Sequence, residues 1–141
     1  IGDGILKKRC IKFCKDNKLK NVSFLGFKNQ KQIVNYYCLS DVIVMPSEYE
    51  TWGLSVNEAM AAGCACLISK ETGCSEDLII SNGKYKNGFV FDAGDIKDLS
   101  YKIKFFIKNK KQLKSMKRNS LKIVEKFIFE KTVNSIKNII K

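Results

Sequence analysis

The sequence predicts an α/β fold, in which a parallel β-sheet carries helices on both of its faces. Short apolar runs alternate along the chain with longer segments whose apolar residues recur at helical spacing, and this alternation is typical of parallel sheets. The run DVIVMPS (41–47) is almost continuously apolar, as expected for a strand buried between two helix layers. The chain contains no internal repeat and no low-complexity linker.

Four strands are expected, because four apolar runs end at turn-forming residues. The runs are NVSFLG (21–26), DVIVMPS (41–47), CACLIS (64–69) and GFVFDA (88–93). Helices are predicted where apolar residues recur at intervals of three and four. They cover residues 5–17, 30–39, 55–63, a short turn at 75–80, 96–107, 113–123 and a last segment with Val133, Ile136 and Ile140.

The same spacing indicates which side of each helix faces the core. The residues expected to face inward are Ile33, Val34 and Tyr37, then Leu99, Ile103, Phe106 and Ile107, and finally Leu113, Met116, Ser120 and Ile123. Two helix ends are also marked. Gly63 is a typical stop signal, and Asp95, with Asp98 three residues later, is typical of a helix start.

A length of 141 residues with 45% hydrophobic content suffices for one core, so we expect a single domain over residues 1–141. No window approaches the run of about 18 apolar residues that a membrane span needs. The start, IGDGILKKRC, lacks the apolar stretch of a secretion signal. A cytoplasmic protein is therefore expected.

The six cysteines show no C-x-x-C spacing, and the chain contains no histidine. Reduced thiols, mostly buried and acting as small apolar side chains, are therefore favoured over disulfides or a metal site. The absence of histidine also removes the commonest general base and metal ligand from this chain. No metal ion and no cofactor are expected.

The formal net charge is +12, and almost all of it lies in a basic helical tail, residues 97–141. The tail has 14 Lys or Arg and three acidic residues, whereas residues 1–96 have 12 and 11. Its lysines fall between apolar residues without the aromatic and basic alternation of a nucleic-acid platform, so we expect no nucleic-acid partner. A solvated helix face is the first interpretation, and an anionic membrane surface or acidic partner is the second.

Ligands of parallel α/β sheets bind beyond the carboxyl ends of the strands, in the turns that lead into helices. Four such turns are predicted, at residues 2–4, 26–28, 46–54 and 69–75. The third turn is the longest and leads into the predicted helix at 55–63. The first turn of that helix offers free N–H groups and the positive end of the helix dipole, which suit a phosphate.

Two glutamates flank this candidate phosphate site. Glu50 precedes Gly53, a residue that would let a ligand approach the backbone closely, and Glu58 lies one turn into the helix. Carboxylates repel phosphate, but each can accept two O–H donors from a sugar. The pattern therefore predicts a site for a nucleotide sugar.

Other interpretations of the same residues stay open. Ser55 and Glu58 have the spacing of a capping box, in which both side chains serve the helix end. Glu48 is interpreted as an exposed loop acid. Trp52 is interpreted first as a packing residue under the loop and second as a platform on which a base stacks.

The segments SEYETWGL (47–54) and EAMAAG (58–63) resemble the signature of the glycosyl transferases group 1 family, which are retaining nucleotide-sugar glycosyltransferases of the GT-B fold. Glu50 and Glu58 are separated by seven residues, as the glutamate pair of that family is. The flanking segments GDG, NVSFLGF, DVIVMPS and NGFVFDAGD resemble the family too, in order and spacing, up to about residue 106.

The resemblance implies that the chain is the C-terminal, donor-binding half of a two-domain enzyme with a Rossmann-like sheet. It implies that Glu58 binds the ribose hydroxyls and that Glu50, the catalytic candidate, lies by the transferred sugar. The other substrate-binding candidates that it implies are Gly53, Leu54 and Ser55 at the diphosphate, Trp52, Phe27 near the base, and Gly2, Asp3 and Gly4 along the same cleft. The family is generally independent of metal ions.

The implied function is retaining transfer of a hexose from a UDP- or GDP-linked sugar to a glycan or lipid-linked acceptor, with peripheral contact at the inner face of the membrane as a further expectation. Two strands and a helix that begin the family's domain are absent, and so is the acceptor domain. We therefore expect unpaired sheet edges and an inactive fragment. The alternatives are a non-catalytic nucleotide-binding domain of the same fold, or a binder of anionic surfaces or nucleic acid through the basic tail.

Overall fold

The computed structural model describes residues 1–127. The chain divides into two compact units, Ile1–Asn35 and Tyr36–Lys141, and each is described by itself. Helix α2 (Gln30–Leu39) begins in the first unit and ends in the second.

The first unit contains helix α1 (Lys7–Asp16), and Asn17, near which the helix was expected to end, is its C-cap. None of its residues is buried. The predicted turns at residues 2–4 and 26–28 meet inside this unit, because the N–H of Gly2 donates to the carbonyl of Gly26 over 2.9 Å. Asp3 caps the same turn by accepting from the N–H of Gly4 and from Lys7.

The expected strand at residues 21–26 is wrong. This segment is an irregular coil with exposed apolar side chains, among them Val22, Phe24 and Leu25. A strand exists only where its N–H and C=O groups pair with a neighbouring strand, and no described segment of this unit forms a ladder with it. The apolar composition of residues 21–26 is therefore not enough to make them a strand.

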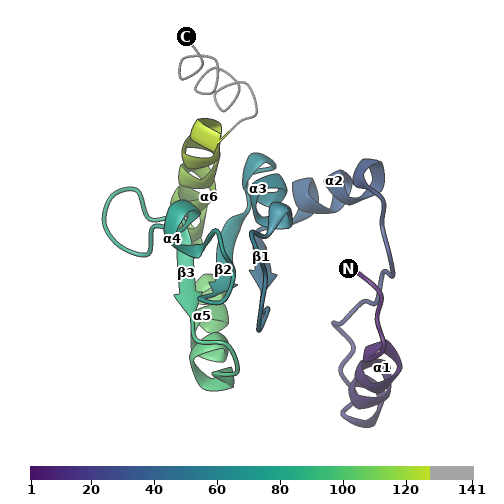
Figure 1. Ribbon diagram of the computed structural model, residues 1–141. Helices are drawn as coiled ribbons and strands as arrows, with labels where there is room; N and C mark the ends of the chain where they lie inside the picture. The colour runs from purple at the N-terminus through teal and green to yellow at the C-terminus, as the bar shows by residue number, and fades with distance from the viewer. Residues whose placement is uncertain (128–141) are drawn as a thin grey trace. The chain divides into compact units, whose positions relative to one another are not determined.

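The second unit is built on the other three predicted strands, β1 (Val42–Met45), β2 (Ala65–Ser69) and β3 (Gly88–Phe91). They form a parallel sheet in the order β1-β2-β3, and Figure 1 shows them side by side. All five residues of β2 are buried, whereas β1 is an edge strand among the described residues. The parallel arrangement brings the three carboxyl ends to one edge of the sheet.

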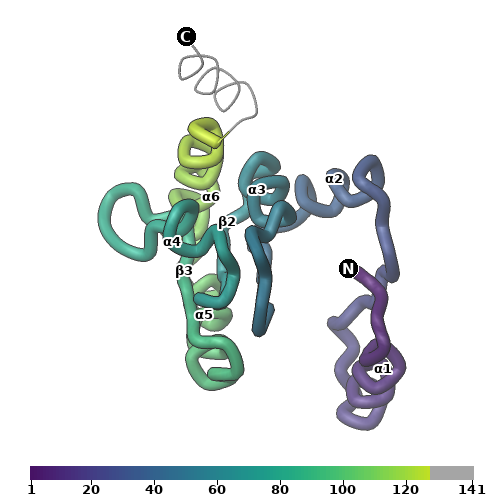
Figure 2. The backbone as a smooth tube through the Cα atoms, in the orientation of Figure 1, coloured from purple at the N-terminus to yellow at the C-terminus, as the bar shows by residue number. Residues whose placement is uncertain are grey.

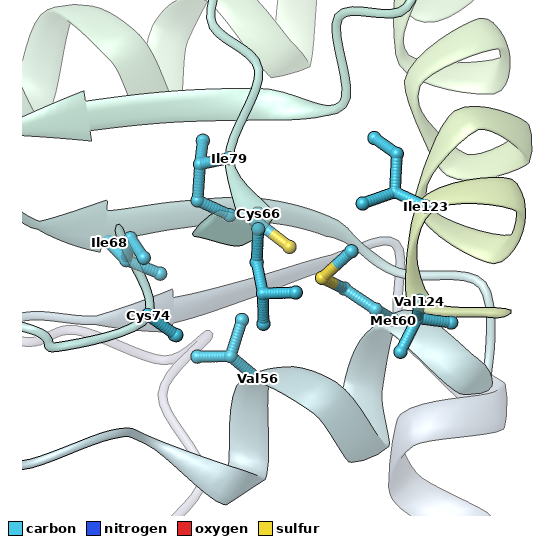
Figure 3. Packing of buried hydrophobic residues seen from close by; sticks show 9 residues of the cluster. Val56, Met60, Cys66, Ile68, Cys74, Ile79, Ile123 and Val124 are labelled. Carbon is cyan, nitrogen blue, oxygen red and sulfur yellow. The ribbon is translucent and has the colours of Figure 1, made fainter. Parts of the chain in front are cut away.

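Both faces of β2 carry a hydrophobic cluster, as its position in the middle of the sheet requires. On one face Cys66 and Ile68 pack against Val56 and Met60 of helix α3, and the end of helix α6 completes the cluster with Ile123 and Val124 (Figure 3). On the other face Ala65 and Leu67 pack against residues of helices α5 and α6, namely Phe106, Leu113 and Met116.

The helices of this unit lie where the apolar periodicity predicted them. They are α3 (Leu54–Ala61), α4 (Ser75–Leu78), α5 (Ile96–Lys108) and α6 (Lys110–Val124), followed by the 3₁₀ turn η1 (Glu125–Phe127). Gly63, with φ +82°, ends α3 as expected, and the side chain of Asp95 caps α5 by accepting from the N–H of Asp98 over 2.9 Å. The predicted last segment, with Val133, Ile136 and Ile140, lies outside the described residues.

Three residues expected to face inward are exposed. Ile103 and Ile107 on α5 line an open cavity of 280 Å³ beside Val42 and Val44 of β1, where no described strand covers the edge of the sheet. Val34 on α2 is also exposed, and Tyr37 is the one buried residue of that helix. The expected inward stripe of α6 is confirmed, since Leu113, Met116, Ser120 and Ile123 are all buried.

The six cysteines are free, and half of them follow the expectation. Cys64, Cys66 and Cys74 are buried, and burial raises the pKa of each thiol, that of Cys74 to about 11. Cys10 and Cys38 are exposed instead, and Cys14 is half-buried. Cys10 and Cys14 lie on α1, which has no buried residue, and Cys38 lies on α2, where only Tyr37 is buried.

A loop runs out from α4 and returns to β3, as the trace in Figure 2 shows. The fully buried Asn87 closes its base. The Asn87 side chain accepts from the N–H of Ile80 over 2.8 Å and donates to the carbonyl of Leu78 over 2.9 Å. A buried amide with both polar atoms satisfied fixes where β3 begins.

Replacing Asp95 with alanine is expected to lower the free energy of unfolding by about 1 kcal/mol, because the first turn of α5 loses its side-chain acceptor. Asp95→Asn keeps an acceptor and is the matched control. Urea unfolding measures both variants. An equal loss in the asparagine variant would contradict the capping role.

Candidate functional site

Two predicted turns, residues 46–54 after β1 and 69–75 after β2, meet at the carboxyl edge of the sheet. Backbone hydrogen bonds join them: the N–H of Glu50 donates to the carbonyl of Glu71 over 3.1 Å, and the N–H of Gly73 donates to the carbonyl of Glu50 over 2.8 Å. The N–H of Cys74 donates to the carbonyl of Trp52 over 3.0 Å. The longer turn is therefore held along its length by the shorter one.

Two glycines make this approach possible. A Cβ at Gly73 would lie 2.0 Å from the carbonyl oxygen of Thr51, a distance that only the absence of a side chain permits. Gly53 has φ +94°, and a Cβ there would lie 2.9 Å from Cγ2 of Thr72. Gly53 is buried, so in this structure its lack of a side chain serves the contact with Thr72.

Ser69, Thr72 and Gly73 are part of this arrangement and were not singled out from the sequence. The hydroxyl of Ser69 donates to the carbonyl of Ser47, and it lies 3.2 Å from the hydroxyl of Thr72. The sequence pattern that could have indicated them is a polar residue at the end of an apolar run, Ser69, followed by a glycine in the next turn, Gly73.

Helix α3 begins directly after this double turn. Gly53 is its N-cap, and no side chain caps it. The capping-box interpretation is therefore wrong, because the helix begins one residue before Ser55, at Leu54, and Ser55 cannot act as its N-cap. Leu54 is 70% exposed, so the first turn of α3 is accessible at the carboxyl edge of the sheet.

Glu58 lies one turn further along α3 and is half-buried. Its Oε2 accepts a hydrogen bond from the phenol of Tyr37 over 3.3 Å. The pKa of that phenol is raised, chiefly by burial, while a hydrogen bond from Ser55 acts in the opposite direction. The contact of Glu58 with α2 was not anticipated, since 21 residues separate the two side chains.

Glu50 is also half-buried, and its Oε1 lies 3.5 Å from the N–H of Trp52 and from the hydroxyl of Thr51. These are long contacts, so the position of Glu50 depends mainly on its backbone pairing with the 69–75 turn. Glu48 is exposed, as expected for a loop acid.

Trp52 packs under the loop. It lies against the hydrophobic cluster that contains Val56 and Met60, and its Nε1 donates to Oδ1 of Asn57 over 2.9 Å. Both observations fit the first interpretation of Trp52, as a packing residue.

The remaining site candidates lie in the first unit. Gly2, Asp3 and Gly4 line a cavity of 420 Å³ in that unit. The Asp3 carboxylate pairs with Lys7 at 2.9 Å, and this hydrogen bond holds the pKa of Asp3 below its ordinary value. Phe27 is 75% exposed. The two glutamates, Trp52 and residues 53–55 thus belong to the second unit. Residues 2–4 and Phe27 belong to the first.

Part of the basic tail forms a separate groove in the second unit. A cavity of 510 Å³ is lined by Lys110, Lys114 and Arg118 of α6, together with Asp41 and Gly63. Asp41 precedes β1 and Gly63 precedes β2, so the groove lies at the amino ends of these strands, away from Glu50. None of the three cations has an ion-pair partner within residues 1–127.

Residues 1–127 offer neither a metal-binding cluster nor a membrane-spanning helix. No group of three or more His, Cys, Asp or Glu side chains is arranged to hold a metal ion. No helix in this part of the chain is long and apolar enough to cross a membrane.

The family described as "Glycosyl transferases group 1" matches residues 1–123. The sulfoquinovosyl transferase SQD2 of Arabidopsis thaliana is 30% identical over 82% of this chain and 22% of its own length. The UDP-Gal:alpha-D-GlcNAc-diphosphoundecaprenol alpha-1,3-galactosyltransferase of Escherichia coli is 32% identical over 87% of this chain and 30% of its own length. The chain therefore spans less than a third of the length of these relatives.

Solved structures share the fold. A sucrose-phosphate synthase from Thermosynechococcus elongatus has a TM-score of 0.82 at 23% identity, covering 96% of this chain and 34% of that chain. The C-terminal domain of the glycosyl transferase group 1 protein LpcC from Francisella tularensis has a TM-score of 0.72 at 23% identity, over 85% of this chain and 60% of that domain. The predicted GT-B type of fold, a parallel sheet with helices, is confirmed.

Gly73→Ala is expected to lower the free energy of unfolding by more than about 3 kcal/mol, because a methyl group cannot fit beside the Thr51 carbonyl without parting the two turns. Gly83→Ala is the control: Gly83 has φ +76° but open space around it, so only the backbone cost of about 1–2 kcal/mol is expected. Denaturant unfolding measures both. Equal losses would show that the close approach is dispensable.

Proposed function

The chain belongs to the glycosyl transferases group 1 family, and on this premise we propose that it is the donor-binding part of an enzyme that transfers a hexose from a nucleoside-diphosphate sugar to a glycan or lipid-linked acceptor, with retention. The observation that carries the proposal is the placement of Glu50 and Glu58 on either side of an uncapped, accessible helix start. In a nucleoside-diphosphate sugar, the anionic diphosphate likewise lies between two groups that carry hydroxyls, the ribose and the sugar.

The proposed roles follow from what each group can bind. The N–H groups of Leu54 and Ser55, at the positive end of α3, bind the diphosphate. Glu58 accepts hydrogen bonds from the two ribose hydroxyls, because one carboxylate has room for two O–H donors. Glu50 accepts from hydroxyls of the transferred sugar, on the side of the phosphate that faces the reaction.

The proposed catalysis depends on charge that develops on the departing diphosphate. N–H dipoles that are already oriented stabilise this charge without reorganising during the reaction. Holding the donor at both ends, through Glu58 and Glu50, aligns its anomeric carbon with the acceptor. The chain contains no histidine, so any imidazole that assists must come from outside these 141 residues.

Two similar proteins support the choice of ligand. A structure of HepE from Anabaena, 22% identical with a TM-score of 0.72, is described as a complex with UDP-glucose. The Escherichia coli relative is named for a UDP-galactose donor and a diphosphoundecaprenol-linked acceptor. We propose a UDP- or GDP-linked donor for this chain, and an acceptor-binding domain elsewhere in the whole protein. A non-catalytic nucleotide-binding domain of the same fold is the alternative.

A second role is favoured by the groove on α6. Lys110, Lys114 and Arg118 lack ion-pair partners in the described part of the chain, and apolar Leu113 and Leu121 line the same groove. Cations beside apolar side chains suit the headgroup region of an anionic membrane. We propose that this groove contacts such a membrane while the opposite edge of the sheet holds the donor.

Glu58→Gln in the whole protein is expected to weaken binding of the nucleotide donor by about 1–3 kcal/mol, because a charged acceptor of the ribose hydroxyls is lost. Isothermal titration with UDP and GDP measures the change. Glu48→Gln, the same substitution at an exposed loop position, is the control and is expected to leave affinity unchanged.

Titration with UDP-sugars and GDP-sugars, followed by hydrolysis and transfer assays, separates the proposed enzyme from its alternative. The enzyme is expected to hydrolyse or transfer the sugar slowly, and Glu50→Gln is expected to reduce this turnover more than it weakens binding. Donor binding without turnover for any acceptor tried would favour a non-catalytic domain. An unchanged affinity in Glu58→Gln would contradict the assignment of the ribose site.

Replacing Lys110, Lys114 and Arg118 with glutamine is expected to reduce binding to phosphatidylglycerol vesicles more than tenfold, because each cation near an anionic surface contributes about 1 kcal/mol. The control removes the same charge from α5 through Lys97, Lys104 and Lys108, which are exposed. Vesicle co-sedimentation at low and at about 0.2 M salt measures both. Equal losses in the two triple variants would leave the groove without a specific role.

A further inference from the structure

Tyr37 connects helix α2 to the candidate ribose glutamate. Its side chain is 8% exposed, and its hydroxyl donates to Oε2 of Glu58 over 3.3 Å. Within residues 1–127, Oε1 of Glu58 has no hydrogen-bond partner. The phenol therefore takes one of the roughly four acceptor sites of the carboxylate and leaves sites on both oxygens for other donors. Ser55, in the first turn of α3, also interacts with this phenol.

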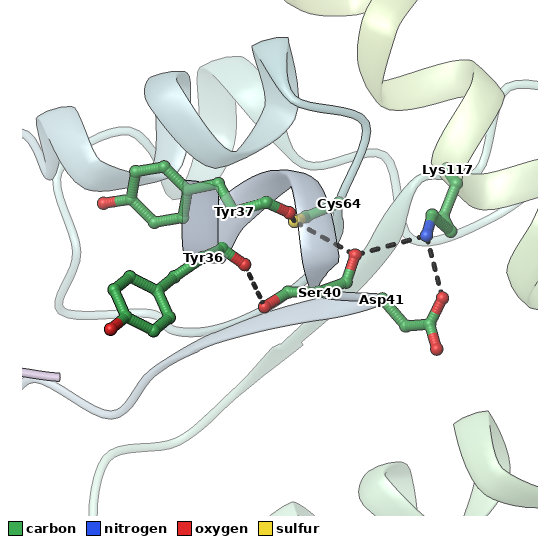
Figure 4. Close-up of polar contacts among 6 residues, drawn as sticks. All are labelled: Tyr36, Tyr37, Ser40, Asp41, Cys64 and Lys117. Carbon is green, nitrogen blue, oxygen red and sulfur yellow. Dashed lines mark hydrogen bonds and ion pairs between the residues drawn. The ribbon is translucent and has the colours of Figure 1, made fainter. Parts of the chain in front are cut away.

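The chain around Tyr37, at the end of α2, is held by contacts with Cys64 and with Lys117. The thiol of Cys64 donates to the carbonyl of Tyr37 over 3.3 Å. Lys117 on α6 donates to the carbonyl of Ser40 over 3.2 Å and pairs with Asp41 at 2.8 Å. Figure 4 shows these contacts gathered at the end of α2.

A tyrosine fixed in this way restricts its partner. A free glutamate on a helix surface samples several rotamers, and ordering it on ligand binding costs conformational entropy. A buried donor that engages Oε2 before the ligand arrives removes part of this cost, which is how a rigid neighbour raises affinity. The remaining acceptor sites of the carboxylate then have a defined direction towards the incoming hydroxyls.

We propose that Tyr37 is a positioning residue that orients the Glu58 carboxylate for the ribose of the donor and so contributes to selection of ribonucleotides over 2′-deoxyribonucleotides. This inference rests on the proposed function, in which Glu58 binds the ribose. Tyr37 acts through Glu58 and does not itself contact the nucleotide.

The selectivity has a physical cause. The two neighbouring hydroxyls of a ribose can both donate to one carboxylate only if the plane of the carboxylate is turned towards them. A 2′-deoxy nucleotide presents one hydroxyl, so it gains less from an oriented carboxylate. Loss of orientation is therefore expected to cost the ribonucleotide more than its deoxy analogue.

The test measures dissociation constants of UDP and 2′-deoxy-UDP, and in parallel of GDP and 2′-deoxy-GDP, by calorimetry with the whole protein. Tyr37→Phe keeps the buried ring and removes the donor. It is expected to weaken ribonucleotide binding about three- to tenfold, the range of one hydrogen bond, and to lower the ratio of deoxy to ribo dissociation constants. Tyr101→Phe, the same change at a residue that is 69% exposed, is expected to alter neither quantity.

A double-mutant cycle shows whether the two side chains act together. If Tyr37 acts through Glu58, Tyr37→Phe is expected to weaken binding less in the Glu58→Gln variant than in the unmodified protein. Full additivity, or an equal loss for ribo and deoxy nucleotides in Tyr37→Phe, would overturn the proposal and indicate a packing role. An unchanged affinity in Glu58→Gln would instead refute the ribose site itself.

A second variant covers the case in which Tyr37→Phe does not fold. Ser55→Ala removes the other side chain that interacts with the phenol, and it is expected to lower the ratio of deoxy to ribo dissociation constants by a smaller factor. Melting curves without nucleotide establish that each variant is folded at the temperature of the titration. An unchanged ratio in a folded Ser55→Ala variant would then overturn the proposal.

Discussion

The candidate site depends on the backbone pairing of Glu50 with Glu71 and Gly73. Long loops normally have no fixed conformation, because ordering each residue costs about 1–2 kcal/mol. Here the 46–54 turn is paired with the next turn almost as a strand would be, and the pairing sets where Glu50 lies and where α3 begins. Without a glycine at position 73, the Thr51 carbonyl could not approach, so one missing side chain underlies the arrangement.

The parallel sheet explains why the two turns can meet at all. Because β1 and β2 run in the same direction, the turns that follow them leave from the same edge, and a short span of backbone suffices to join them. The same geometry sends the preceding segments to the other edge, where Asp41 and Gly63 border the basic groove. The two ends of the strands are thus free to serve different ligands, and a change of charge in the groove need not disturb the glutamates.

Local patterns predicted most of this fold because helices and buried strands depend largely on nearby residues. The bounds of α2 and the caps at Gly63 and Asp95 followed from short-range signals. The strand expected at 21–26 failed because strand formation needs a neighbour, and Ile107 was misplaced because its surroundings depend on what lies beside β1. Tyr37 was expected to be buried, but its contact with Glu58 and that of Gly73 with Thr51 were not predicted, since these contacts join segments that lie far apart in the sequence.

From spacing alone, Glu58 could be either part of a helix cap or a ligand for ribose. The structure excludes the helix cap. The helix begins at Leu54 without a side-chain cap, so Glu58 is not needed there, and its carboxylate bonds to Tyr37 instead. The two glutamates are therefore held by different means: Glu50 by the backbone of its loop, Glu58 by a side chain of another helix. Because the two sets of hydrogen bonds share no atoms, loss of the Tyr37 contact would leave the backbone pairing of Glu50 intact.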